Sequence, residues 1–449
     1  MSFIWCDRNA TDLMPQTWHA FRSGSWLTPA RARGYSLILL AIALLGIVTW
    51  IALSNGLVDR NDKPLGTDFS SFYTAGELAL EGKASSAYSA AAHHALQQQM
   101  FGANTPYYAW LYPPSFFLAA APLALLPYPL ALALWQGSTL VSYLLVIAAI
   151  LQRPRRQSPE IAKLWLPVAA AFPAAFINLG HGQNGFLSAA LFGAALLCLA
   201  RRPIIAGILL GALSYKPQLA LVIPFALLAA GQWRTMIAGG MAVILLAAAS
   251  ALLFGSDAWW AFIASTDVSR KLLLEEGSVG FEKLQSAFAA VRMWGGSIGL
   301  AYAVQGAVAA AAICATARVW YLDQSREVKA ALLLAGTTLA SPHILDYDLM
   351  LLAPAMAFFI ANRSSSQFRN YEISLLAAVW TAPLLARTVA GLVALPVGFL
   401  ANLVLFVLIV RDQTGLLPSP HALADLRSRT VDTDEATRAP GIVTKAGAA

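Results

Sequence analysis

The hydrophobic positions of the chain fall into about a dozen apolar runs separated by short polar segments. A helix of about 20 apolar residues crosses a bilayer, so these runs predict membrane-spanning helices. Several runs are shorter, and proline interrupts them, as at Pro217, Pro224 and Pro354. Irregular backbone at membrane depth persists only where protein or a wet cavity surrounds it, which predicts an internal cavity. The runs are 35–55, 113–127, 129–151, 164–180, 185–200, 203–215, 217–231, 234–254, 297–318, 328–340, 347–361, 371–386 and 392–410.

Composition supports lipid as the solvent for these runs. The chain is 58% hydrophobic and 12% charged, whereas soluble proteins carry about 25% charged residues. Its net charge of +7 comes from short basic clusters between the runs, so we predict no nucleic-acid partner. Residues 1–34 lack the apolar core of a cleavable signal, and the run that begins near Tyr35 is predicted to be an uncleaved anchor.

The basic clusters predict how the chain is oriented. Cytoplasmic loops are enriched in lysine and arginine, so these clusters are expected on the cytoplasmic side. They lie at 22–33, 153–163, 201–202, 234, 326–329, 363–369 and 411. The segments expected on the other side are 56–110, 180–184, 214–217, 255–296 and 341–348, with a short turn near Arg387.

The segment 113–151 leaves two alternatives open. It holds two apolar pieces joined at residues 126–129, yet the charge rule requires an odd number of crossings there. Either 113–127 is re-entrant, or the basic residues at 153–156 face outward. The number of spans is therefore uncertain by one or two.

The two long outer loops are expected to carry helices. Residues 68–101 are compatible with helix, and the pair His93–His94 is interpreted as a solvated helix face. In 278–294, apolar residues recur at three- and four-residue spacing, which predicts a helix lying on the membrane face. The recurring residues are Phe281, Leu284, Phe288 and Val291.

These patterns together predict an all-α polytopic membrane protein with about 11–13 transmembrane or re-entrant helices and short interfacial helices in its outer loops. The expected organisation is a cytoplasmic tail at 1–34, a membrane domain at 35–411, and a second cytoplasmic tail at 412–449. The second tail is polar and rich in Ala, Asp, Thr and Pro, which is typical of disorder.

Asp68 is the first candidate for chemistry. It lies in segment 66–73, after the first apolar run and at the mouth of any cavity that the bundle encloses. A carboxylate there, partly shielded by Phe69 and Tyr73, is suited to act as a general base on a hydroxyl. The alternative is a solvated loop aspartate, or the N-cap of a helix that begins at Phe69.

Two other segments offer groups that bind sugars or lipids. Residues 107–114 include Tyr112 and are rich in aromatics and proline, which fits either an interfacial belt or an aromatic wall for a lipid or sugar. The segment 179–185 contains Gln183 and Asn184, whose amides bond sugar hydroxyls or phosphate oxygens. A helix that starts at Asn184 would also favour an anion, and the alternative is a simple turn.

Two further outer segments carry ionisable residues. Lys216 lies between short apolar runs, where a lysine is costly unless it is paired or faces water. It either binds an anionic lipid phosphate or extends to the head groups. His343, Asp346 and Asp348 lie close together in sequence. They are too few for a confident metal site, and His343 alternatively bonds or neutralises a phosphate.

Several well-known catalytic motifs are absent from the sequence. It contains no phosphate-binding Walker loop, no Gly-x-Ser-x-Gly elbow, no His-Glu-x-x-His and no dinucleotide fingerprint. ATP-driven pumping and serine-hydrolase chemistry therefore have no support.

An ordered series of short motifs between residues 35 and 410 points to a family. The motifs are Asp68-Phe69 through Tyr73, Ala75, Gly82, Tyr88, Tyr112-Pro113-Pro114, 122–127, Gly182-Gln183-Asn184, Gly207 through Lys216-Pro217, Gln285-Ser286 and Ser341-Pro342-His343. Each motif is weak alone, but the ordered set is fairly specific. The chain thus resembles glycosyltransferase family 87, the polyprenol-phosphate-mannose-dependent mannosyltransferases and relatives with the GT-C membrane fold.

The resemblance implies an activity and a location. The donor would be a sugar, classically mannose, carried on a polyprenyl phosphate, and the acceptor a glycan or glycolipid on the non-cytoplasmic face. The β-linkage of the donor would be inverted to an α-glycoside, with no metal or other cofactor. The protein would lie among the lipids of a bacterial inner membrane, with its active site on the periplasmic or extracellular side.

The resemblance also implies roles for residues. Asp68 would act as the base. Because the leaving lipid phosphate is charged, nearby cations would stabilise the transition state, and Lys216, His343 and Arg292 are the candidates. The full set implied to bind substrate is Tyr73, Tyr112, Gln183, Asn184, Lys216, Gln285, Arg292 and His343.

Two other functions stay open at this point. A secondary transporter or flippase of a lipid-linked sugar should show inverted repeats and ionisable groups near the middle of several spans. Here the ionisable groups gather at one face and no repeat is evident, which favours an enzyme. An inactive scaffold would predict that Asp68→Asn changes nothing beyond expression.

Overall fold

A computed structural model gives the fold, and the structure describes residues 10–363 and 368–411. The predicted tail at 412–449 lies outside the described residues. Within them the protein is helical, with isolated β-bridges and no β-strand. Six helical segments are long and apolar enough to cross a membrane: α2 (Pro29–Ala52), α6 (Tyr128–Ile150), Pro159–His181, α13 (Trp233–Phe254), α16 (Ile298–Tyr321) and α19 (Glu372–Val393). Shorter apolar segments are Pro114–Ala124, Gly185–Cys198, Pro203–Tyr215, Pro217–Ala229 and Val397–Arg411. The prediction of an all-α polytopic membrane protein is confirmed.

The ambiguous segment 113–151 contains one helix long enough to span. The first piece forms only a 3₁₀ turn and α5 (Phe117–Ala124), whereas α6 runs for 23 residues. The first piece packs closely on α3 (Phe69–Leu80), because a Cβ on Gly76 would meet the carbonyl oxygen of Ala120. At 1.5 Å per residue α5 crosses less than about half of a bilayer. Its length favours the re-entrant alternative.

Prolines begin helices here more often than they kink them. Pro173 separates α8 (Pro159–Ala170) from α9 (Pro173–His181) within one membrane-length unit. Pro224 is in the first turn of α12 (Ile223–Ala229). Irregular backbone at membrane depth requires that the freed backbone groups find partners inside the protein. A groove of about 490 Å³ beside the end of α2 is lined by α2 and residues 59–61, and none of the predicted site residues lines it.

The segment 330–359 is buried except at Pro342, His343 and Leu345. α17 (Arg326–Ala340) is buried from Ala330 onward, and so are the 3₁₀ helix η7 (Asp346–Leu351) and most of α18 (Leu352–Arg363). Small residues dominate α17, which allows neighbouring helices to approach closely. This burial places Asp346 and Asp348 in the interior of the protein.

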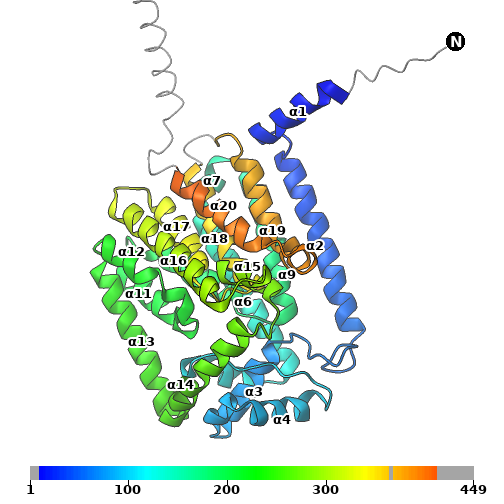
Figure 1. Ribbon diagram of the computed structural model, residues 1–449, viewed down its shortest axis with the longest axis vertical. Coiled ribbons are helices and arrows are strands. Elements are labelled where there is room, and N and C mark those ends of the chain that lie inside the picture. The colour runs from blue at the N-terminus through cyan, green and yellow to red at the C-terminus, as the bar shows by residue number, and fades with distance from the viewer. Residues whose placement is uncertain (1–9, 364–367, 412–449) are drawn as a thin grey trace, which may run out of the picture.

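The two ends of the bundle carry different elements (Figure 1). α1 (Ala10–Ser23), α7 (Gln152–Gln157) and the C-terminal end of α20 (Val397–Arg411) lie at one end. α3, α4 (Ala90–Phe101) and α14 (Ser256–Arg270) lie at the other. The helices expected in 68–101 are confirmed as α3, the turn η1 (Ala84–Tyr88) and α4.

One feature of this region was predicted wrongly. His93 is fully buried, at 0% exposure, whereas a solvated helix face was expected. Burial lowers the pKa of His93 to about 4, so the ring is neutral at physiological pH. His93 is therefore a core residue of the segment 68–101.

The segment 278–294 also differs from prediction. Phe281–Lys283 forms a 3₁₀ turn, Leu284 is extended, and α15 (Ala287–Met293) is short. Leu284, Phe288 and Val291 form a buried cluster with Leu274 and other residues. The three- and four-residue spacing therefore serves a small protein core and not a membrane-facing helix, a distinction that periodicity cannot make.

Arg387 does not lie in a turn. It is exposed within α19, and the chain turns only after Val393, where Ala394 adopts a left-handed conformation. An arginine inside an apolar helix is costly at membrane depth and marks a functional position by default.

Candidate active site

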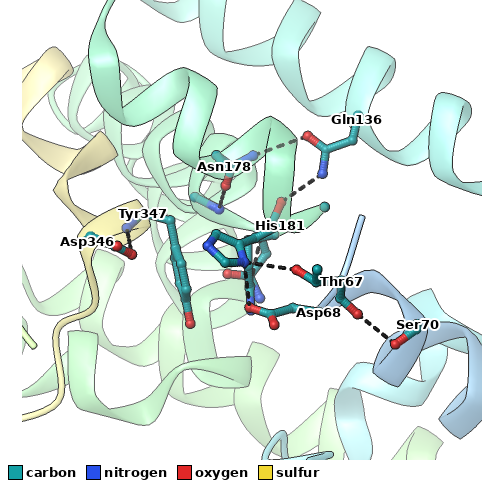
Figure 2. A network of polar contacts seen from close by, with 12 residues as sticks. Thr67, Asp68, Ser70, Gln136, Asn178, His181, Asp346 and Tyr347 are labelled. Carbon is teal, nitrogen blue, oxygen red and sulfur yellow. Dashed lines mark hydrogen bonds and ion pairs between the residues drawn. The ribbon is translucent and has the colours of Figure 1, made fainter. Parts of the chain in front are cut away.

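Asp68 lies at the N-terminus of α3, but its side chain does not cap the helix. Nε2 of Gln183 donates to its Oδ2 at 2.9 Å, and Nδ1 of His181 lies 3.9 Å from the same oxygen. Oδ1 has no hydrogen bond within the described residues, and the side chain is 28% exposed. Figure 2 shows the carboxyl group beside the His181 ring. Asp68 thus occupies the N-cap position before Phe69, as the alternative expected, but its side chain makes no capping hydrogen bond.

Hydrogen bonds hold the turn that follows α9 in place. The backbone N–H of Asp68 donates to the carbonyl of His181 at 3.0 Å. Asn178 donates to Oε1 of Gln136 at 3.2 Å and accepts from the backbone of Gly185 at 2.6 Å (Figure 2). Gln136 in turn donates to the carbonyl of Gln183 at 3.2 Å. Each amide in a buried network of this kind rigidifies the next, so the turn presents Gln183 to Asp68 in one orientation.

Gly182 makes this close approach possible. Its φ is +65°, and a Cβ would come within 2.5 Å of Cβ of Phe69 and 2.9 Å of the carbonyl oxygen of Gly66. Left-handed backbone is costly for residues with a side chain, and here the neighbours include backbone that has little room to move.

We expect Gly182→Ala to displace Asp68 and lower activity. The strain amounts to about 1–3 kcal/mol of folding free energy. The matched control is Gly180→Ala in the same segment, because Gly180 has open space around its Cβ position. Thermal unfolding in detergent and sugar-transfer rates measure both effects. Equal behaviour of the two variants would contradict a tight contact between the turn and α3.

Tyr112 extends the network into the interior. Its hydroxyl donates to Oε1 of Gln183 at 3.2 Å and accepts from Nδ2 of Asn184 at 3.0 Å. Burial raises the pKa of Tyr112 well above its usual range, and the nearby Asp68 charge adds to this, so the hydroxyl stays protonated. Asn184, the N-cap of α10 (Gly185–Cys198), is buried, and its Oδ1 has no hydrogen-bond partner in the described structure. Tyr112, Gln183 and Asn184 are thus brought together with Asp68 in one hydrogen-bond network, and their substrate-binding roles stay predictions.

Lys216 is paired inside the protein. Its Nζ donates to Oδ1 of Asp348 at 2.5 Å and lies 4.9 Å from the centre of the Tyr347 ring. The two charged side chains are only 4% and 2% exposed. Lys216 therefore does not extend to the head groups. Its predicted contact with a lipid phosphate is untested, and Asp348 now balances its charge.

His343 and Asp346 lie around this pair. Burial lowers the pKa of His343, with Asp348 acting in the opposite direction, so the ring is neutral near pH 7. Burial raises the pKa of Asp346, while His181 and Arg387 oppose the shift. Arg387 is therefore close enough to Asp346 to influence its charge, and it makes no ion pair within the described residues. Asp346 itself accepts from the backbone of Tyr347 at 2.9 Å.

The close packing of η7 against the turn explains this grouping. A Cβ on Gly185 would lie 2.6 Å from the carbonyl oxygen of Tyr347, so the start of α10 touches η7 directly. Among the described residues, no three His, Cys, Asp or Glu side chains come together in a way that could hold a metal ion.

Three other predicted site residues bond to backbone rather than to Asp68. Tyr73 donates to the carbonyl of Leu126 at 2.7 Å. The backbone of Gln285 donates to the carbonyl of Ile344 at 2.7 Å, which places this segment beside His343. Arg292 donates to the carbonyls of Gly296 and Glu275, at 2.8 and 3.1 Å. These two bonds stabilise the segment 275–296 to which Arg292 belongs. The site roles predicted for these three stay predictions.

Sequence reasoning missed three neighbours of the site: Gln136, His181 and Arg387. Gln136 and Arg387 are polar residues within apolar helices, and this is the signal that could have identified them. His181 was visible in the segment 179–185, but nothing in its spacing indicated that its ring meets Asp68.

Comparison with protein families gives a match. A model of the family described as glycosyltransferase family 87 matches residues 110–342. No curated protein and no solved structure matches the chain.

Proposed function

The chain belongs to glycosyltransferase family 87, and from this premise we propose that it transfers a sugar from a polyprenyl-phosphate donor to a glycan or glycolipid acceptor. Mannose is the sugar we propose. The family membership makes the protein a membrane glycosyltransferase, in line with its apolar helices. The proposed reaction inverts the β-linkage of the donor to give an α-glycoside, with Asp68 as the base.

The observation that carries the proposal is the hydrogen bonding and exposure of the Asp68 carboxyl group. Gln183 holds one oxygen, while the other has no hydrogen bond in the described structure and the side chain is part exposed. A general base must reach the hydroxyl that it activates. Asp68 is oriented and still accessible to an acceptor hydroxyl, as that role requires.

Leaving-group stabilisation is the second requirement. A departing lipid phosphate carries negative charge, which cations and N–H donors stabilise. Arg387 is exposed and lacks an ion pair in the described residues, and neutral His343 has a ring N–H. Lys216 contributes less, because Asp348 already balances its charge. The donor arrives within the membrane, so no nucleotide-binding domain is needed.

The proposed orientation places Asp68 on the non-cytoplasmic side of a bacterial inner membrane. α3 lies at the end of the bundle opposite α7 and the C-terminal end of α20 (Figure 1). Those elements carry Arg155, Arg156 and Arg411. Positive residues concentrate on the cytoplasmic side, which supports this orientation.

The proposal is tested with purified protein in liposomes. We expect label to pass from polyprenyl-phosphate-[¹⁴C]mannose to a glycolipid fraction, and no label to pass from a nucleotide-linked mannose. A flippase would instead move the labelled lipid across the bilayer without forming a new glycoside. Transfer from the nucleotide sugar alone would contradict the proposed donor.

We expect the activity to persist in excess chelator. Asp348 is engaged by Lys216, and Asp346 accepts from its own segment's backbone, so neither is proposed as a metal ligand. Transfer rates are compared in EDTA, and in EDTA followed by excess Mg²⁺ or Mn²⁺. Activity lost in EDTA and regained with a divalent ion would restore these aspartates as candidate metal ligands.

A further inference from the structure

His181 is a titratable group that lies beside Asp68. Its Nδ1 lies 2.9 Å from the Thr67 hydroxyl and 3.9 Å from Oδ2 of Asp68. Its own backbone carbonyl accepts from the N–H of Asp68 at 3.0 Å. Two hydrogen bonds, one to the Thr67 hydroxyl and one between the backbones of His181 and Asp68, thus hold the ring beside the carboxyl group.

The His181 ring lies in a part-exposed position beside Tyr347. Its ring faces Tyr347 at 6.3 Å between centroids, and the side chain is 28% exposed. The charged and titratable groups around it are Asp68, the buried Asp346, and Arg387, which acts on Asp346. Figure 2 shows the ring lying between Asp68 and Tyr347.

We propose that His181 is a positioning residue that takes up the proton which Asp68 removes from the acceptor. This inference rests on the proposed function. The acceptor O–H bond breaks and its proton passes to Asp68, while the acceptor oxygen bonds to the sugar C1. The C1–O bond to the lipid phosphate breaks, and its electron pair leaves with the phosphate.

The second step restores the carboxylate. The carboxyl torsion of Asp is soft and roughly two-fold, so the protonated oxygen turns toward Nδ1 of His181. In the tautomer that this step requires, Nδ1 is unprotonated and accepts from the Thr67 hydroxyl at 2.9 Å. When the proton moves to Nδ1, the hydroxyl turns to accept from it. The imidazolium then releases the proton to water, because His181 is part exposed. Asp68 is ionised again for the next acceptor.

Two substitutions distinguish proton uptake by His181 from a purely structural role of its side chain. The amide of His181→Asn stands near the place of Nδ1 and keeps a hydrogen bond to Thr67, yet it takes up no proton. His181→Ala removes both functions and leaves space that imidazole from solution enters. Multiple-turnover kcat and donor KM are measured for each, with and without added imidazole, at matched expression.

We expect both variants to lose at least about tenfold in kcat with donor KM unchanged, since proton transfer contributes about 10²–10⁴-fold in enzymes. Added imidazole should restore His181→Ala and leave His181→Asn unchanged. Full activity of His181→Asn, or failure of imidazole to restore His181→Ala, would overturn the inference, because support alone would then explain the residue.

Asp68→Asn is assayed alongside to keep the two proposals apart. Imidazole should not restore it, because the base itself is missing. Transfer that survives in Asp68→Asn counts against the proposed function. Transfer that survives in His181→Ala while Asp68→Asn is inactive counts against the inference alone.

Discussion

Replacing Asp68 with asparagine lowers sugar transfer by about 10²–10⁴-fold, the contribution expected of a positioned general base. Asparagine has the same size, and its amide oxygen still accepts from Nε2 of Gln183, so the turn at 179–185 keeps its place. What it loses is the ability to accept a proton. The change therefore falls on kcat with little effect on the amount of folded protein. Transfer of radiolabelled mannose from the polyprenyl-phosphate donor measures it.

The matched control is Asp62→Asn in the loop that leads to Asp68. Asp62 is exposed and has a φ of +56°, which asparagine also tolerates. Its Oδ2 accepts only from Asn104, at 3.3 Å, among the bonds of the described residues. We expect this variant to retain wild-type transfer. Equal rates for wild type and Asp68→Asn would remove Asp68 from the mechanism.

Replacing Lys216 with alanine destabilises the protein by about 3–5 kcal/mol, because it leaves the Asp348 charge buried and unpaired. Asp348 is 2% exposed, and its other oxygen accepts only a backbone N–H, from Leu345 at 3.2 Å. Asp348 must then either stay ionised at a high cost or take up a proton. Thermal unfolding in detergent and the yield of folded protein measure the loss.

A double-mutant cycle separates stability from donor binding. Lys216→Met with Asp348→Leu replaces both charges by apolar groups of similar size, which is often close to neutral for a buried pair. We expect the double variant to regain most of the lost stability. If its donor KM is also normal, Lys216 serves the fold alone. A raised KM in the stable double variant would instead support the phosphate contact predicted for Lys216.

The candidate site was accessible from sequence only in part. Asp68, Tyr112, Gln183 and Asn184 were all named from short motifs, and the structure joins them in one hydrogen-bond network. These motifs were found because the residue types themselves are unusual between apolar runs. The order of the network, from Tyr112 through Gln183 to Asp68, was not predictable, because the three residues come from segments far apart in the sequence.

Other predictions failed because a local pattern has more than one tertiary use. The apolar spacing in 278–294 suited an interfacial helix equally well, yet Leu284 and Phe288 pack in a small core. His93 was expected on a solvated helix face, but it is fully buried in the protein. Periodicity reports which residues avoid water, and it does not say whether lipid or protein covers them.

The sequence by itself determined the all-helical membrane fold and most span positions, because bilayer thickness fixes the number of apolar residues that a crossing helix needs. It also marked Asp68 as a candidate base, since a partly shielded carboxylate after the first span lies where it could reach a hydroxyl. Only the tertiary structure decided which charges meet. Lys216 pairs with Asp348, His181 approaches Asp68, and Arg387 influences Asp346. Each of these pairs joins distant segments, and electrostatic interactions depend on separation and burial in space, which sequence spacing does not specify.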